Sequence, residues 1–71
     1  MTDEKRLREK IQESGYKITF IAKKLGITYQ GFLKKLTNES EFKASEIQSL
    51  CSLLSIDLRE KESIFFCHNC R

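Results

Sequence analysis

Apolar residues follow helical spacing at the start of the chain. Leu7 and Ile11 lie one turn apart within a segment, 3–14, that is otherwise polar and charged, and this is the pattern of an amphipathic helix. Thr2 and Asp3 are candidates for the cap of the first turn, and Gly15 can close the last turn in the left-handed conformation. The pattern therefore predicts a first helix over 3–14.

Two shorter helical stretches follow. The first carries apolar residues over two turns, at Ile18, Ile21, Ala22 and Leu25. Gly26 comes next and marks the end of this helix, and Thr28 offers an N-cap hydroxyl for another. Phe32 and Leu36 are one turn apart in that third helix, whose end we expect at Asn38.

The second half of the chain predicts a loop, a longer helix and a final short segment. The polar loop 38–43 contains one aromatic residue, Phe42, which we expect to plug the core. A fourth helix over 44–55 places its apolar residues on one face, at Ile47, Leu50, Cys51 and Leu54. Ile56 and Leu58 begin a last segment that we interpret as a short helix followed by an extended piece.

Composition agrees with this pattern. A chain of 71 residues allows one domain with a thin core and favours a binding module over an enzyme. Its content of 39% hydrophobic and 32% charged residues is that of a globular protein, and proline, which interrupts helices, is absent. We expect a compact all-α domain of five helices over residues 1–66 and a flexible tail over 67–71.

The chain carries no sign of a membrane or secreted protein. Its longest apolar run, Ile64–Cys67, is far shorter than a membrane span, and no apolar segment follows the charged N-terminus. We therefore expect a cytoplasmic protein with no membrane partner, whose three cysteines stay reduced.

Positive charge is concentrated in the middle of the chain. Between Ser14 and Asn38 there is no acidic residue, and there are five lysines, at positions 17, 23, 24, 34 and 35. Such a surface suits nucleic acid or an acidic protein partner. The alternative is a solvated lysine face without a partner.

Three positions within 18–37 match the steric demands of a helix-turn-helix. Ala22 is small where the two helices cross, Gly26 supplies a positive φ in the turn, and Phe32 fills the wedge between the helices. The joint spacing of these residues is more specific than any one of them alone. The sequence therefore predicts a helix-turn-helix, with an unrelated helical hairpin as the alternative.

The run Ile18–Asn38 that carries these positions resembles the lambda repressor and Cro family. The segments Glu41–Ile47 and Ile64–Phe66 are similar to small prophage regulators of Gram-positive bacteria, a group of Cro-like proteins and of antirepressors named modulators of repression. The resemblance spans nearly the whole chain and implies a lambda-repressor-like domain. It also implies a role in the choice between lysogenic and lytic growth inside a bacterial host cell.

The resemblance implies one set of DNA-contacting residues. In relatives that bind operators, the second helix of the motif lies in the major groove and reads base edges with its N-terminal residues. The corresponding residues here are Thr28, Tyr29, Gln30, Lys34 and Lys35. Gln30 can pair with adenine, and Lys34 can donate to guanine or to a phosphate. One interpretation is therefore a Cro-like repressor that itself binds operator DNA.

Two departures from these relatives weaken that interpretation. Ile18 stands where many relatives have a glutamine that binds a phosphate, and isoleucine cannot donate a hydrogen bond. The turn after the recognition helix carries Glu39 and Glu41, whose charges repel a phosphate. Both departures predict a lowered affinity for DNA.

Aromatic residues on the same surface suit a protein partner. Phe20 occupies a position that is usually polar and exposed, and together with Lys24, Tyr29 and Leu33 it would provide apolar anchors beside a charged rim. The preferred interpretation is an antirepressor that binds the DNA-binding domain of a phage repressor through these four residues. The alternative for Phe20 is that it packs against the first helix or the tail.

The remaining reactive residues predict neither catalysis nor metal binding. Cys67 and Cys70 have the spacing of half a zinc site, but His68 is poorly placed to share an ion with both, and Cys51 lies on the inner face of a helix. No carboxylate pair accompanies a nucleophile. We expect no enzyme activity, no metal, no cofactor and no small-molecule substrate.

Overall fold

The computed structural model describes residues 2–66, and within this range the chain forms five α-helices and no β-strand. They are α1 (Glu4–Ser14), α2 (Ile18–Leu25), α3 (Tyr29–Leu36), α4 (Ala44–Leu54) and α5 (Leu58–Phe65). The expected all-α architecture of five helices is confirmed. The extended piece expected after the short last helix is not seen at residues 64 and 65, which are the last residues of α5. The tail expected over 67–71 lies outside the described residues.

Side-chain oxygens close the first turn of three helices. These caps are Asp3, Thr28 and Asp57, which accept from the backbone N–H three residues on at 3.2, 3.0 and 2.8 Å, respectively. Each such bond contributes about 1 kcal/mol to helix stability. The caps at Asp3 and Thr28 confirm the prediction. The cap of α5 was missed, although Asp57 and Glu60 have the spacing of a capping box.

Residues in the left-handed conformation end three of these helices. Gly15 (φ 78°) follows α1 and Gly26 (φ 76°) follows α2, as predicted. The fourth helix ends at Leu54, one residue earlier than predicted, because Ser55 adopts φ 56°. Asn38, with φ 68°, takes the same conformation two residues beyond α3.

One hydrophobic core holds the five helices together. Its buried members are Leu7, Ile11, Ile21, Ala22, Phe32, Leu36, Ile47, Leu50, Leu54, Ile56, Ile64 and Phe65. Phe42 plugs this core, as predicted, because its ring meets those of Phe32 and Phe65 edge to face at centroid distances of 5.8 and 5.6 Å. Cys51 is half-buried at the edge of the core, and Leu58 is exposed.

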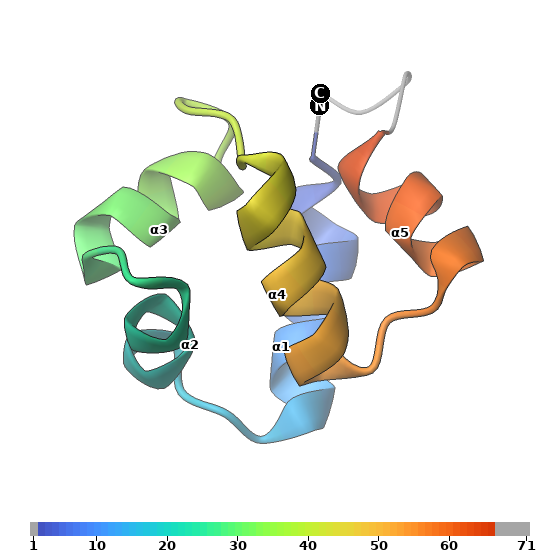
Figure 1. Cartoon of the computed structure of the whole chain (residues 1–71), viewed down its shortest axis with the longest axis horizontal. Helices are drawn as coiled ribbons and strands as arrows, with labels where there is room; N and C mark the ends of the chain where they lie inside the picture. The colour runs from blue at the N-terminus through green and yellow to red at the C-terminus, as the bar shows by residue number, and fades with distance from the viewer. Residues whose placement is uncertain (1, 67–71) are drawn as a thin grey trace.

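The helices are arranged around α4 (Figure 1). The α2 helix packs against α3 and α4, whereas α1 packs against α4 and α5. The α2–α3 pair therefore lies at one end of the molecule and α5 at the opposite end. This arrangement leaves the side of α3 that faces away from the core open. None of the helices in the described range is long and apolar enough to span a membrane.

Candidate partner-binding face of the helix-turn-helix

The α2–α3 pair has the geometry of a helix-turn-helix. Ala22 is 2% exposed at the crossing of the two helices, and Phe32 is fully buried between them. The turn is closed by the N–H of Ile27, which donates to the carbonyl of Ala22 at 3.0 Å, next to the left-handed Gly26. The predicted roles of Ala22, Gly26 and Phe32 are confirmed.

The outer side of α3 is polar and open. Gln30 and Lys34 are exposed and lie one turn apart, opposite the buried Phe32 and Leu36. Tyr29 is 46% exposed at the start of the helix. These side chains are available to a partner molecule.

Thr28 precedes this helix, and its hydroxyl oxygen caps the backbone of Gly31 at 3.0 Å. The hydroxyl hydrogen is left free to donate. Of the five residues that the resemblance assigns to DNA, four are exposed at the start of α3 or along it: Thr28, Tyr29, Gln30 and Lys34.

An aromatic stack lies on the exposed side of α2. Phe20 stacks on Tyr16, with ring centroids 5.1 Å apart and an interplanar angle of 28°, and Lys24 Nζ lies 5.5 Å from the centre of the Phe20 ring. Both rings remain about 40% accessible, at 41% for Tyr16 and 39% for Phe20. We call Tyr16, Phe20 and Lys24 the aromatic stack. Sequence reasoning missed Tyr16, although its four-residue spacing from Phe20 was a signal.

Leu33 and Lys35 are less available than the sequence suggested. Leu33 is half-buried and packs against the core, so it offers only part of its side chain. Lys35 is 14% exposed, and its Nζ lies 2.7 Å from Glu46 Oε1 in an ion pair. Because this ion pair engages its ammonium group, Lys35 offers less accessible charge to a partner than the exposed Lys34 does.

Two positions that bind a DNA phosphate in operator-binding relatives differ here. Ile18, in the first turn of α2, is half-buried against the core. In the turn after α3, the N–H groups of Glu39 and Ser40 both donate to the carbonyl of Lys34, at 2.8 and 3.2 Å. These amides are therefore already used within the protein, and the exposed carboxylates of Glu39 and Glu41 add repulsion.

The charge of the face is positive. Four of the five lysines between Ser14 and Asn38 have exposed side chains, at positions 17, 23, 24 and 34. They surround the aromatic stack and the open side of α3, and this stretch of the sequence contains no carboxylate. A partner with negative charge is favoured.

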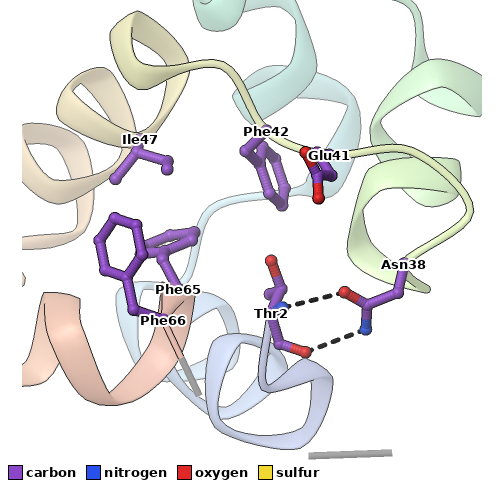
Figure 2. A pocket seen from close by; sticks show the side chains of 7 residues that line it. All are labelled: Thr2, Asn38, Glu41, Phe42, Ile47, Phe65 and Phe66. Carbon is purple, nitrogen blue, oxygen red and sulfur yellow. Dashed lines mark hydrogen bonds between the residues drawn. The ribbon is translucent and has the colours of Figure 1, made fainter. Parts of the chain in front are cut away.

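A surface pocket of about 260 Å³ lies at the end of α3 (Figure 2). It is lined by the phenyl rings of Phe42 and Phe65 and by Thr2 and Asn38, with Glu41 as the one ionisable side chain among its lining residues. Among residues 2–66 no cluster could hold a metal ion, and the Cys67, His68 and Cys70 group lies outside the described residues.

Comparisons with known proteins agree with this geometry. The family model described as Cro/C1-type HTH DNA-binding domain matches residues 6–60, which include α2, α3 and α4. The comparisons with curated proteins and with solved structures gave no match.

Proposed function

The chain belongs to the Cro/C1-type helix-turn-helix DNA-binding family, a family of transcription regulators, and we propose that within this family it is an antirepressor of a phage genetic switch. It binds the DNA-binding domain of a partner repressor and thereby blocks operator binding. The family membership shows that the chain is a helix-turn-helix regulator, and it does not distinguish an antirepressor from a repressor that binds operator DNA. The choice of a protein partner rests on the outer face of α2 and α3.

The observation that carries the proposal is the aromatic stack. Exposed aromatic rings next to cationic side chains are typical of the anchors at protein interfaces. Phe20 and Tyr16 keep about 40% of their surface accessible, at 39% and 41%, and Tyr29, at 46%, adds a third ring. A protein surface that buries these rings gains far more from them than a phosphate backbone does.

The electrostatics of the partner follow from the lysines. Lys24 lies over the Phe20 ring, and it would form a charged rim around the aromatic anchor. A repressor domain with acidic groups opposite this rim is therefore the expected partner. Leu33 contributes only the accessible part of its half-buried side chain.

A Cro-like repressor that binds operator DNA is the second candidate. The exposed Gln30 and Lys34 on the open side of α3, behind the Thr28 cap, favour it because they match side chains that read base edges. The isoleucine side chain at position 18, the engaged amides of Glu39 and Ser40 and the carboxylates of Glu39 and Glu41 argue against tight binding.

A mobility-shift assay with the repressor and operator encoded beside this gene tests the proposal. The protein alone is expected to leave the operator unshifted up to about micromolar concentration. Added to a repressor–operator complex, it is expected to release the DNA. Specific shift of the operator by the protein alone, at nanomolar concentration, would contradict the proposal and support the Cro-like role.

A further inference from the structure

The orientation of α3 depends on two polar ties at its C-terminal end. This helix has only eight residues and two buried side chains, Phe32 and Leu36, and it packs chiefly against α2. Neither tie involves α2. One tie joins α3 to α4 through an ion pair, and the other joins the turn after α3 to the start of the chain through an amide side chain.

The first tie is the ion pair between Lys35 and Glu46. The Lys35 Nζ to Glu46 Oε1 distance is 2.7 Å, and the two side chains are only 14% and 8% exposed. The same Oε1 accepts from the backbone N–H of Lys43 at 2.8 Å, which fixes Glu46 at the start of α4. The backbone of α4 thus orients this carboxylate. The ion pair with Lys35 then fixes the end of α3 relative to α4.

The second tie is a pair of hydrogen bonds between Asn38 and Thr2 (Figure 2). The Thr2 N–H donates to Asn38 Oδ1 at 2.9 Å, and Asn38 Nδ2 donates to the Thr2 carbonyl at 3.0 Å. The next residue, Asp3, donates its N–H to the carbonyl of Ile64 in α5 at 2.6 Å. Asn38 therefore connects the end of α3 to the far side of the molecule.

We propose that Lys35, Glu46 and Asn38 are positioning residues that set the direction of α3 relative to the aromatic stack on α2. None of them contributes its side chain to the candidate face, yet Lys34, which does, directly precedes Lys35. Contact residues at an interface must be held to within a fraction of an ångström and a few degrees. The inference rests on the proposed function in that α3 contacts the partner, whether that partner is a repressor or an operator.

Two variants remove the ties without leaving an unpaired buried charge. The double variant Lys35→Met/Glu46→Gln removes both charges, and the glutamine oxygen can still accept from Lys43. Asn38→Gly removes the amide side chain but tolerates the left-handed backbone at φ 68°. The matched control is Arg8→Met/Glu4→Gln, which removes an exposed ion pair of 2.8 Å on α1.

The first measurement needs no partner. Backbone residual dipolar couplings report the direction of each helix in the free protein. Both tie variants are expected to rotate α3 relative to α2 and α4 while α1 stays in place, and the control is expected to match the wild type. Unchanged α3 couplings in both tie variants would overturn the inference, whatever the protein binds.

The second measurement is affinity for the purified repressor DNA-binding domain and, separately, for operator DNA, at a temperature where each variant is folded. Each tie variant is expected to weaken binding of the physiological partner about threefold to tenfold, and the control is expected to have no effect. Rotation of α3 with unchanged affinity would overturn the functional role of the ties. If the wild type binds neither probe, the proposed function fails, and the couplings still decide whether these residues position α3.

Discussion

The inner and outer faces of the helix-turn-helix differ in how many kinds of side chain each position can accommodate. On the inner face, Ala22 and Phe32 are 2% and 0% exposed, and only a small residue or a large apolar one fits each place. On the outer face, Phe20 and Tyr29 are 39% and 46% exposed, and many side chains would fit. We therefore expect the inner face to determine the fold and the outer face to determine the partner.

The difference explains why one architecture can serve opposite regulatory roles. Substitutions on the inner face change the free energy of unfolding, because close-packed atoms have no room to adjust. Substitutions on the outer face leave the fold intact and change which molecule is bound. Variants of both faces test this difference, beginning with the buried residue whose truncation is expected to lower the free energy of unfolding most.

Phe32→Ala is expected to destabilise the protein most. Phe32 is fully buried and contacts Phe42 edge to face, so truncation leaves a cavity that the small core cannot fill. The expected loss is about 3 to 5 kcal/mol in the free energy of unfolding, a large share of the stability of such a domain. Urea denaturation measures it. A loss below about 1 kcal/mol would mean that the inner face does not determine the fold.

Gly26→Ala is expected to have a smaller effect on the same face. At φ 76° a side chain is strained even though no atom lies within 4 Å of the added Cβ. The expected loss is about 1 to 2 kcal/mol. Gly26→Asn is the control, because asparagine tolerates this conformation better. Equal losses for the two variants would show that backbone strain is not the cause.

The pH dependence of stability tests the ion pair that joins Lys35 of α3 to Glu46 of α4. Burial alone would raise the pKa of Glu46, but the hydrogen bonds from Lys35 and from the backbone of Lys43, with the charges of both lysines, lower the pKa below its ordinary value. A carboxyl group whose pKa is lower in the folded state stabilises the protein fully above its unfolded pKa. That contribution is lost as the pH falls through the folded pKa.

The free energy of unfolding of the wild type is therefore expected to fall more steeply than that of Glu46→Gln between about pH 5 and pH 3. Urea denaturation at several pH values measures both slopes. Parallel curves would show that the pKa of Glu46 is the same in the folded and unfolded states, which would contradict this prediction.

The fold could be predicted from the sequence because its determinants are local. Helical spacing, the Asp3 and Thr28 caps and the glycines after α1 and α2 all act within a few residues. Phe42 could be identified because a lone aromatic ring in a polar loop gains most by burial in the core. The start of α5 is also encoded locally, because Asp57 and Glu60 have the spacing of a capping box. It was missed because the start of this segment was placed by its apolar residues, Ile56 and Leu58.

The candidate site could be predicted only in part because contacts between helices are not local. The exposure of Gln30 and Lys34 follows from their positions in α3, whereas spacing left open whether Phe20 is exposed or packs against the first helix or the tail. The ion pair of Lys35 with Glu46 joins residues 11 apart in sequence on different helices, so no spacing rule identifies it. Without that contact, Lys35 looked equivalent to Lys34.

The most direct test of the central claim compares two pairs of outer-face variants against two partners. Phe20→Ala and Tyr29→Ala remove aromatic anchors, whereas Gln30→Ala and Lys34→Ala remove the side chains suited to base edges and phosphate. All four residues are exposed, so the fold is expected to remain intact, which circular dichroism checks. Each variant is titrated against the purified repressor and against operator DNA at several salt concentrations.

If the protein is an antirepressor, Phe20→Ala and Tyr29→Ala are each expected to cost more than about 1 kcal/mol in affinity for the repressor, roughly a fivefold loss. The affinity is also expected to depend less on salt than phosphate binding does. Tight, sequence-specific operator binding by the protein alone, weakened by Gln30→Ala and Lys34→Ala but not by Phe20→Ala, would contradict the account.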